Sequence, residues 1–562
     1  MSTQQLMFLM FVCTFVACNN NSKHKEKEIV SEPAKMDQVV QSKLEAILSS
    51  ITKSKGKLDD SSTLVSFALV KEFYSSNQYK GVWGSTQNYL PVAYSMLQFI
   101  KQSKLYGLFP EQYHVQQLTT NFERFAADTL SQTDRRDAVF WTKNDLLLTD
   151  AFLTMARHLH KGRLMPDSIY KIIDSTQGLS FYHSYLKTFL QGTPITEVLN
   201  SLEPKHKGYQ ALRKHIKPFL DSAKFLPVFT YLNYPYKDSS AFVKLLIRRL
   251  KEEGVVGWQI NQLDSSQLME VISTVQKQKK LAVDGKFGVQ LINALNNTDA
   301  EKFKRIAINL DRYKLLPGEM PERYIWVNLP SYYLQVMEND SVKLESKVVI
   351  GKPKTRTPLL NSTISDLVTY PQWTIPNSII VKEILPALKK NPGYLARKGY
   401  MLLTWDGELI DPYAVNWVKY SKGIPYKVVQ GSGDANALGV LKFNFPNKYS
   451  VYLHDTNQRY LFKNESRALS HGCVRVQEWE KLVWYISGLD SIAALAKNST
   501  PLPSDSIKAW LERKERHVIP VRSKLPVYFR YFTASVRNDK VFFYNDIYGE
   551  DKTAREAYFS NK

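Results

Sequence analysis

The spacing of apolar residues changes near residue 320, and this change limits the folds that the chain can adopt. Before it, in stretches such as "NDLLLTDAFLTMARHLHKGRL", apolar residues recur at three- and four-residue intervals, and the run ends near Gly162. This spacing predicts helices that bury one face. From Arg323 onward, segments such as "RYIWVNLPSYYLQVM" and "KYSVYLH" alternate and are rich in β-branched and aromatic residues, which predicts strands. The sequence therefore predicts an α+β protein of several domains, helical first and mainly β later.

Length and composition favour about three folded domains. Of the 562 residues, 44% are hydrophobic, which is enough for several cores. Between about 377 and 433 the strands are interrupted by a segment that is long for a connection and typical of a lid. The expected segments, in chain order, are a helical domain over 39–240, a small three-helix domain over 241–300, a mainly β domain over 320–500 and a C-terminal extension over 501–562.

The N-terminus predicts export. Its apolar run from Leu6 to Ala17 is too short to span a bilayer but has the length of a signal-peptide core. Ala17 and Cys18, followed by the polar segment "NNNSKHKEKE", resemble a bacterial lipobox, so we expect residues 1–18 to be a lipoprotein signal and Cys18 to be lipidated. An ordinary cleaved signal or a frayed apolar end are the alternatives. Residues 19–38 are polar and predict a flexible tether. We therefore expect an exported, periplasmic protein that is lipid-anchored to a membrane.

The charge balance predicts an anionic partner. The chain has 75 lysines and arginines against 53 acidic residues, which gives a net charge of +22. For an exported protein, such a balance favours cell-wall polymer or phospholipid headgroups over nucleic acid. The sequence contains no nucleic-acid motif, and no stretch after the N-terminal run is long and apolar enough for a transmembrane helix.

Cys473, in "LSHGCVRV", is the candidate nucleophile. The chain has three cysteines. If Cys13 leaves with the signal and Cys18 is lipidated, Cys473 has no disulfide partner, and one thiol is too few for a structural zinc site. We expect no metal and no cofactor, and a buried, inert cysteine is the alternative to a reactive one. The loop that holds Gly472 and Cys473 is expected just before a helix, where the helix dipole and a nearby imidazolium would lower the pKa of the thiol.

Two histidines compete for the role of base. His471 is close to Cys473 in sequence, whereas His454 lies at the end of an expected strand, from which it can converge on a loop nucleophile. We expect His454 to transfer protons, oriented by Asp455 or by the backbone carbonyl of that residue, and His471 to shape the pocket. Gly472 lets the backbone approach a substrate closely, so the N–H groups beside it could face a developing oxyanion.

Several motifs point to one family. "HDTN" followed by "SHGCVRV" resembles the two-part signature of the L,D-transpeptidases, the YkuD-type cysteine enzymes of bacterial peptidoglycan. "VVIGKPKTRTPLL", "YPQWTIPNSI" and "NALGVLKFNFPNKYSVYLHDT" resemble the catalytic domain of the large, multidomain periplasmic branch of this family. "VDGKFGVQLINALN" is similar to the peptidoglycan-binding repeat that usually precedes it, and "LLLTDAFLTMARHLHKGRLMP" resembles the helical scaffold domain of that branch.

The resemblance implies a reaction and a set of site residues. Cys473 would attack the bond between the third residue of a stem tetrapeptide and its terminal D-Ala, release D-Ala and form a thioester. His454 would then activate the acceptor amine that makes a 3-3 crosslink. Backbone amides at His471, Gly472 and Cys473 would form the oxyanion hole. The residues implied to lie near the substrate are Ser470, Arg475, Trp417 and Tyr426. For Arg475 a structural ion pair is the alternative, and for the two aromatic residues it is packing within the insertion.

Several functions stay open on the sequence. Water can intercept the same thioester, which gives an L,D-carboxypeptidase, and an enzyme of the same fold can attach a protein to the stem peptide or detach it. A non-catalytic wall-binding lipoprotein is the alternative of another class. The expected partners are the stem peptides and glycan of peptidoglycan and a membrane, with no nucleic acid, and the chain is expected to be a monomer. Donor and acceptor specificity, the choice of inner or outer membrane, and the role of 501–562 are not predicted.

Overall fold

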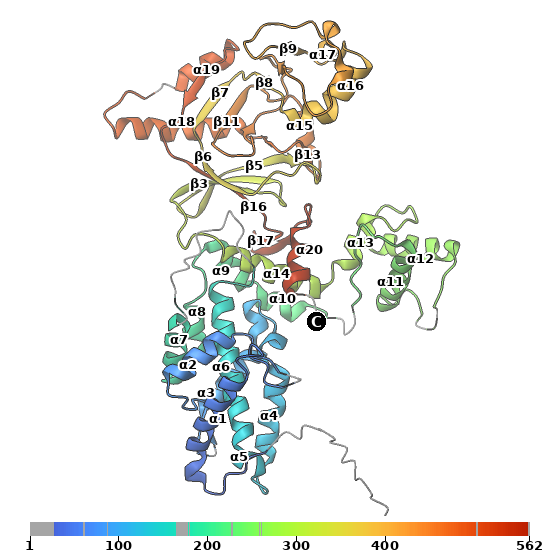
Figure 1. The fold of residues 1–562 in the computed structure, drawn as a ribbon. Coiled ribbons are helices and arrows are strands. Elements are labelled where there is room, and N and C mark those ends of the chain that lie inside the picture. The colour runs from blue at the N-terminus through green and yellow to red at the C-terminus, as the bar shows by residue number, and fades with distance from the viewer. Residues whose placement is uncertain are drawn as a thin grey trace, which may run out of the picture. The chain divides into compact units, whose positions relative to one another are not determined.

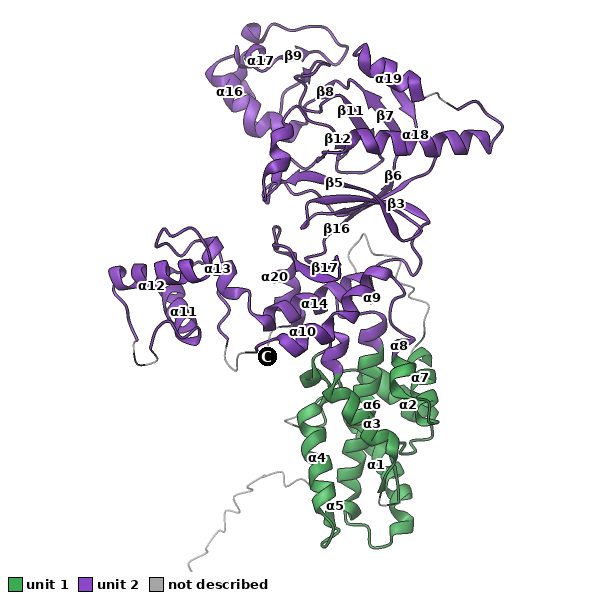
Figure 2. Ribbon diagram, turned by 180° about the vertical axis from the view of Figure 1, so that it is seen from behind, with its two compact units in different colours: residues 1–102, 109–156, 177–199 green, residues 103–108, 157–176, 200–562 purple. Residues whose placement is uncertain are grey.

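The computed structural model describes residues 27–59, 62–86, 88–164, 178, 180–225, 229–257, 259, 261–501 and 504–559. The predicted signal, Cys13, Cys18 and part of the tether lie outside these residues. The described residues fall into two compact units (Figure 2). The first is drawn from residues up to 102, 109–156 and 177–199, and the second from 103–108, 157–176 and 200–562. The predicted mixture of a helical part and a mainly β part is confirmed (Figure 1).

The first unit is helical, as the spacing of apolar residues predicted. Its longest helix, α6 (Ala138–His160), carries a nearly continuous run of buried side chains between Leu146 and Leu159. Because Asp150 of α6 accepts hydrogen bonds from the backbone N–H groups of Val65 and Ser66, this buried carboxylate is satisfied. None of the helices in the described ranges is both apolar enough and long enough to cross a membrane. The other elements of this part are η1 (Pro33–Lys35), α1 (Met36–Ser50), α2 (Phe67–Ser76), β1 (Gly84–Ser85), β2 (Asn88–Tyr89), α3 (Pro91–Lys101), η3 (Pro110–Tyr113), α4 (Val115–Ala127), α5 (Thr133–Arg136), α7 (Ser180–Leu190) and α8 (Ile195–Asn200).

A small group of three helices in the second unit has its own core. The helices α11 (Ser239–Glu252), α12 (Ser265–Gln278) and α13 (Val289–Asn296) bury Leu246, Ile272 and Leu291 against one another. Asp264 begins α12 with a reciprocal capping box, in which its side chain and that of Gln267 bond each other's backbone N–H groups. The turn after α12 is held by Gln276, which bonds to the backbone N–H of Gly285 at 3.0 Å.

A buried charge cluster joins separate segments of the second unit. Asp311 of α14 (Asp299–Tyr313) contacts the Arg163 side chain at 3.0 Å and the Lys314 ammonium at 2.8 Å, and all three side chains are almost fully buried. Burial alone would raise the pKa of Asp311, but the two cations outweigh it and lower this pKa to about 2. Other elements of the second unit outside its main sheet are η2 (Ser103–Tyr106), α9 (Lys207–Lys214), α10 (Ile216–Ser222), β17 (Ala534–Arg537), β18 (Lys540–Phe543), α20 (Glu550–Ala554) and η8 (Arg555–Phe559).

We expect Asp311→Asn to lower the free energy of unfolding by about 3–5 kcal/mol, because it leaves two buried cations without their anion. Urea denaturation at pH 7 measures the change. The matched control is Asp221→Asn, which breaks an exposed pair with Lys217 and should cost less than about 1 kcal/mol. Because the pKa of Asp311 is lowered, its contribution is complete above the ordinary value of 3.8 and disappears as the pH falls through about 2. Equal losses in the two variants would contradict this account.

A curled sheet of 11 strands forms the β part of the second unit (Figure 1). Its order is β15-β7-β11-β12-β14-β5-β4-β3-β16-β6, with β13 beside β5. One face packs on an apolar core to which α18 (Trp479–Leu495) and α19 (Ser504–Glu512) contribute Leu482, Ile486 and Ile507. Two strands of the expected C-terminal extension, β15 and β16, belong to this sheet, so the extension completes it. The strands are β3 (Arg323–Asn328), β4 (Tyr333–Glu338), β5 (Ser341–Gly351), β6 (Leu360–Thr363), β7 (Asp366–Thr369), β11 (Leu441–Asn444), β12 (Leu453–His454), β13 (Ala468–Ser470), β14 (Val474–Val476), β15 (Val518–Pro520) and β16 (Pro526–Arg530).

The segment that interrupts the strands folds around its own small core. It contains a three-stranded sheet in the order β8-β10-β9, and its core includes Leu388, Trp417 and Val428. Because this core is separate from that of the main sheet, the insertion is a structured element rather than an extended loop. Its elements, with the short η7 that follows β12, are β8 (Trp373–Thr374), α15 (Asn377–Ile379), η4 (Ile380–Ile384), α16 (Leu385–Lys390), α17 (Tyr394–Arg397), β9 (Tyr400–Leu403), η5 (Pro412–Ala414), η6 (Trp417–Lys419), β10 (Lys427–Gln430) and η7 (Arg459–Lys463).

Candidate functional site

The parallel pairing of β12 with β14 brings Cys473 and His454, the predicted nucleophile and base, to one face of the sheet. Leu453 pairs with Val474, and both point into the core. Because successive side chains of a strand alternate between faces, His454 and Cys473 project from the opposite face. No hydrogen bond joins Cys473 Sγ to His454 in the described part of the chain, and catalytic contacts are often loose before a substrate binds.

The same alternation brings in Arg475, which the sequence analysis selected, and two residues that it did not select, Tyr452 and Lys442. Tyr452 and Arg475 share the face of His454, and Lys442 of β11 lies directly opposite His454 in the ladder. The ring of Tyr452 lies 5.6 Å from that of His454, and the Lys442 ammonium lies 4.0 Å from the centre of the Tyr452 ring. Period-two spacing in "KYSVYLH" and a lysine between the apolar neighbours of "VLKFNF" were the signals that could have identified Tyr452 and Lys442.

The environment of Cys473 differs from the prediction in two respects. The residues after it form β14, and α18 begins only at Trp479, so no helix N-terminus adjoins the thiol. Burial raises the pKa of the Cys473 thiol above its ordinary value. Tyr452, Lys442 and Arg475 lower it in part, but they do not outweigh burial. The expectation of a thiol with a lowered pKa is therefore wrong, because desolvation of the half-buried sulfur is the larger effect.

His454 is a neutral imidazole with a defined tautomer. Its Nδ1 is hydrogen-bonded to the backbone carbonyl of Asp455, and because a carbonyl only accepts, Nδ1 carries the proton. Nε2 is then the basic nitrogen. Burial, followed by the charge of Arg475, lowers the pKa of His454 to about 3, although the carbonyls of Asp455 and Leu438 act in the opposite direction. The imidazole is therefore uncharged at neutral pH and can accept a proton only while one is being transferred.

Asp455 orients His454 through its backbone. The Asp455 carboxylate accepts the N–H of Val440 at 3.1 Å and contacts Arg459 at 3.0 Å, and it is almost fully buried. The sequence left open whether the side chain or the backbone carbonyl of Asp455 orients His454. In the structure the carbonyl is bonded to the imidazole, and the carboxylate holds the turn around it. Only glycine fits at position 439, because a Cβ there would come within 2.2 Å of the Asp455 carboxylate.

The loop that carries Cys473 is fixed by hydroxyl groups. Gly472 has φ +129°, which disfavours side chains, and its carbonyl accepts the Thr357 hydroxyl at 2.7 Å. Ser470 accepts the N–H of Gly472 at 3.1 Å and donates to the Cys473 carbonyl at 2.6 Å. In the described part of the chain the N–H groups of His471 and Cys473 have no acceptor, so these two donors are available, whereas that of Gly472 is already bonded.

The remaining predicted residues lie in different surroundings. His471 contacts Glu383 of the insertion at 2.6 Å rather than the thiol. Arg475 donates to the Gln458 side chain at 2.8 Å, and its buried Nε has no partner within the described residues. Trp417 is 4% exposed and packs in the core of the insertion, where the ring of Tyr426 lies 6.4 Å away. Of this group, only Arg475 shares the face of His454.

A cavity of about 420 Å³ adjoins the Cys473 loop. His471 and Gly472 form part of its wall, together with Tyr449 and Tyr548. Tyr548 belongs to the C-terminal segment and holds the end of β5 by donating its hydroxyl to the Gly351 carbonyl at 2.7 Å. The cavity therefore gives a ligand room beside the loop, and residues far apart in sequence build its wall.

The raised pKa predicts how Cys473 reacts with an alkylating reagent. We expect the rate constant for its modification by iodoacetamide to rise about tenfold per pH unit between pH 6 and 8, because the thiolate fraction stays small over this range. Rate measurements with mass-spectrometric identification of the modified peptide test this, and an unstructured peptide spanning 469–476 serves as the control. A plateau below pH 7 would show a preformed thiolate and would contradict the prediction.

Two parts of the chain match models of known protein families. Residues 68–216 match the model of the Scaffold domain, and residues 322–491 match that of the L,D-transpeptidase catalytic domain, YkuD. A provisionally named L,D-transpeptidase of Haemophilus influenzae is 35% identical over 249 residues, which cover 44% of this chain and 48% of that protein. This chain therefore spans about half the length of that curated relative.

Two solved structures show only a weak likeness. An L,D-transpeptidase from Mycobacterium smegmatis has a TM-score of 0.18 at 13% identity, over 37% of this chain and 58% of its own. A cysteine-to-serine mutant of an Enterococcus faecium L,D-transpeptidase has a TM-score of 0.15 at 12% identity, over 49% of this chain and 86% of its own. The likeness of this chain to known proteins therefore rests on the two family models and the curated relative.

Proposed function

Because the chain carries a YkuD-type L,D-transpeptidase catalytic domain over residues 322–491, we propose that it is an enzyme that crosslinks the stem peptides of peptidoglycan. The observation that carries this proposal is the placement of Cys473 and His454 on one face of adjacent strands, beside a loop with two unbonded N–H groups. A thiol, a base and oxyanion donors are the groups that acyl transfer requires. The proposal extends to 3-3 crosslinks, the product of joining two third residues.

In the first half of the reaction, Cys473 Sγ attacks the carbonyl that links the third residue of a tetrapeptide to D-Ala. The thiol proton moves to Nε2 of His454, because Nδ1 is held by the Asp455 carbonyl. The C–N bond then breaks, His454 returns the proton to the leaving amine, and D-Ala departs. A thioester on Cys473 remains. In the second half, the acceptor amine attacks the thioester carbonyl and loses its proton to His454. The C–S bond then breaks, and His454 passes this proton to the sulfur, which restores the thiol.

The pKa values favour proton transfer during the attack over a preformed ion pair. Both the thiol and the imidazole are uncharged at neutral pH, since burial raises the pKa of Cys473 and lowers that of His454 to about 3. Lys442 and Arg475 are positively charged and lie close enough to lower the pKa of Cys473, so they stabilise the anion that develops as the proton leaves. We propose them as electrostatic residues of the site.

The Cys473 loop supplies the oxyanion donors in this proposal. The N–H groups of His471 and Cys473 are the available pair, and Ser470 positions them by bonding the N–H of Gly472. Arg475 is proposed to attract a substrate carboxylate. Tyr426 and Trp417 are proposed to act from within the insertion, Trp417 by shaping it because it is buried.

A purified disaccharide tetrapeptide tests the proposed function. Incubation with the mature protein, followed by mass spectrometry, should give a dimer that has lost one D-Ala. Tripeptide without dimer would support an L,D-carboxypeptidase, the alternative in which water takes the thioester. No product and no adduct of Cys473 with a carbapenem would overturn both and favour a non-catalytic wall-binding protein.

The proposed location is the periplasm, with a lipid on Cys18 as the membrane anchor. The polar residues after Cys18 and the net charge of +22 suit attachment next to an anionic wall. We expect Cys18→Ala to move the protein from the membrane to the soluble fraction, as measured by fractionation and immunoblotting, while the turnover of the purified enzyme stays the same. Continued membrane attachment of this variant would contradict the anchor.

A further inference from the structure

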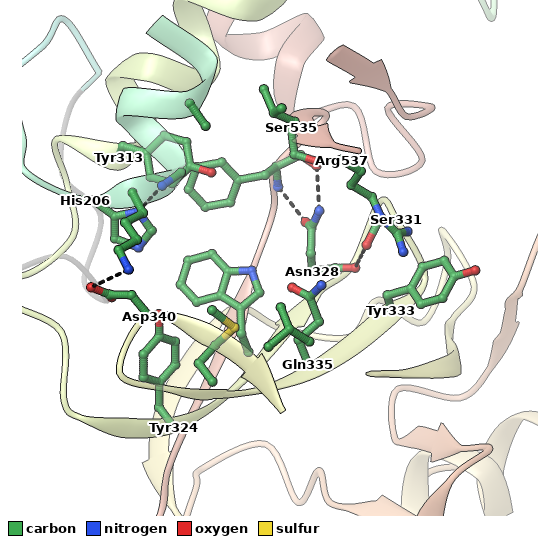
Figure 3. A pocket seen from close by; sticks show the side chains of 18 of the residues that line it. His206, Tyr313, Tyr324, Asn328, Ser331, Tyr333, Gln335, Asp340, Ser535 and Arg537 are labelled. Atoms are coloured by element: carbon green, nitrogen blue, oxygen red, sulfur yellow. Dashed lines mark hydrogen bonds and ion pairs between the residues drawn. The ribbon is translucent and has the colours of Figure 1, made fainter. Parts of the chain in front are cut away.

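A second pocket in the same unit is lined by residues that take no part in the proposed reaction (Figure 3). It has a volume of about 210 Å³ and lies where the outer face of β3 and β4 meets α9 and the β17–β18 hairpin. Strand alternation explains its composition. Ile325 and Val327 of β3 point into the core, so Tyr324, Trp326 and Asn328 point into the pocket.

Aromatic rings form a connected wall in this pocket. Tyr313 lies 4.4 Å from Phe532, and Phe532 lies 5.5 Å from Trp326, measured between ring centres. The imidazole of His206 extends this wall at 4.9 Å from Tyr313. Gly208 permits this approach, because a Cβ there would come within 2.4 Å of the Tyr313 hydroxyl. The wall offers flat apolar faces with polar edges, which suits a ligand that has one apolar face.

One buried donor in the wall has no partner. His206 Nδ1 accepts the N–H of Gly208 at 3.0 Å, so the neutral imidazole carries its proton on Nε2. Nε2 is buried, and the described residues offer it no acceptor. Burial lowers the pKa of His206, which keeps the ring neutral at pH 7. A buried N–H without an acceptor is unfavourable, so a ligand oxygen in the pocket would be stabilised by it.

The charges of the pocket favour an uncharged ligand. Lys207 lies 3.9 Å from Asp340, and Arg537 is paired with Glu345. Each charged side chain thus already has a partner of opposite sign. The Asn328 amide is bonded on both sides to the backbone of Phe532, at 2.9 and 2.8 Å. Hydroxyls of Ser535 and Tyr544, which lie 3.1 Å apart, remain at the edge as groups that can both donate and accept.

We propose that this pocket binds one N-acetylhexosamine unit of a glycan strand. A pyranose ring presents a face of C–H groups that can pack on Trp326 and Tyr313, while its hydroxyls meet Ser535 and Tyr544. The acetamido carbonyl is the oxygen that accepts the Nε2 proton of His206. The inference rests on the proposed function, which brings the protein to a polymer of such sugars, and it gives the enzyme a glycan contact outside the Cys473 site.

Binding of the N-acetylglucosamine trisaccharide to the full mature chain tests the inference by calorimetry. His206→Phe keeps the ring and removes the donor, and Trp326→Leu removes the largest apolar face. We expect each to raise the Kd at least tenfold. The matched controls are His517→Phe, at a partly exposed histidine stacked on Trp510, and Trp484→Leu, at a half-buried tryptophan of α18. Both controls should bind within twofold of the unchanged chain.

Three results would overturn the inference. They are no binding by the unchanged chain, equal affinity in all variants, or loss of affinity in the controls as well. Equal affinity would place the sugar elsewhere, for example on the α11–α13 helices. Melting temperatures establish that the variants are folded, and if Trp326→Leu does not fold, His206→Phe decides the question alone.

A second measurement separates this inference from the proposed function. Turnover of a tetrapeptide without sugar should be the same in His206→Phe and the unchanged chain, whereas the KM for the disaccharide tetrapeptide should rise in the variant. Sugar binding without any turnover would refute the enzyme and leave the sugar site. Turnover with no sugar binding would refute the sugar site and leave the enzyme.

Discussion

Cys473→Ala is expected to abolish formation of the dimer and of the tripeptide from disaccharide tetrapeptide, with a loss of at least about 10⁴-fold in turnover. The reason is that a thioester requires a thiol, and Cys473 is the one cysteine among the described residues. Mass spectrometry of the intact protein should also show no carbapenem adduct.

The control for this variant is Cys473→Ser, which keeps a hydroxyl nucleophile of similar size. It should lose nearly as much activity, because a serine hydroxyl beside an imidazole with a pKa of about 3 is deprotonated even less readily than a thiol. Both variants should melt at the temperature of the unchanged protein, since Cys473 is only half-buried and forms no disulfide within the described residues. Residual dimer formation in Cys473→Ala would assign the chemistry to another residue.

His454→Ala is expected to lower kcat by about 10²–10⁴-fold. The variant removes the acceptor of the thiol proton and leaves the buried space of an imidazole, since His454 is 4% exposed. Imidazole added to the assay should therefore restore part of the activity. Steady-state rates with and without imidazole measure both effects, and the remaining rate should rise with pH as the thiol ionises without a base.

The matched control is His517→Ala, which removes a partly exposed imidazole next to β15, the edge strand that β7 and β11 separate from β12. It should leave kcat unchanged and show no response to imidazole. If instead His471→Ala lost activity that added imidazole restored, and His454→Ala was not restored, the base would be His471. Its contact with Glu383 would then belong to the catalytic site.

Local patterns in the sequence predicted where many of the helices and strands lie. The helices of the first unit and the strands after Arg323 occur where the periodicity indicated them, because helical and strand spacing depend on neighbouring residues. The pair of Cys473 and His454 was proposed from the sequence, as a thiol expected to be unpaired and a histidine at the end of an expected strand. The structure places both on one face of the sheet through the pairing of β12 with β14.

The predictions that failed concern the surroundings of Cys473. The sequence suggested a helix directly after Cys473 and a lowered thiol pKa, but Val474–Val476 form a strand, and burial raises that pKa. The apolar positions of "VRVQEWEKLVW" suit either element at their start, so only the ladder partner in β5 decides between them. The role of the C-terminal segment was equally hidden, because β16 pairs with β3, about 200 residues away in sequence.

The sequence by itself determined the order of helical and β parts, and it proposed the thiol and its histidine as the candidate pair. Only the tertiary structure decided that Tyr452, Lys442 and Arg475 surround them, that a carbonyl rather than a carboxylate holds His454, and that the thiol is uncharged at rest. The physical reason is the distance in sequence over which each property is set. Periodicity is a property of adjacent residues, whereas desolvation and the electric field at an atom depend on every segment that packs around it.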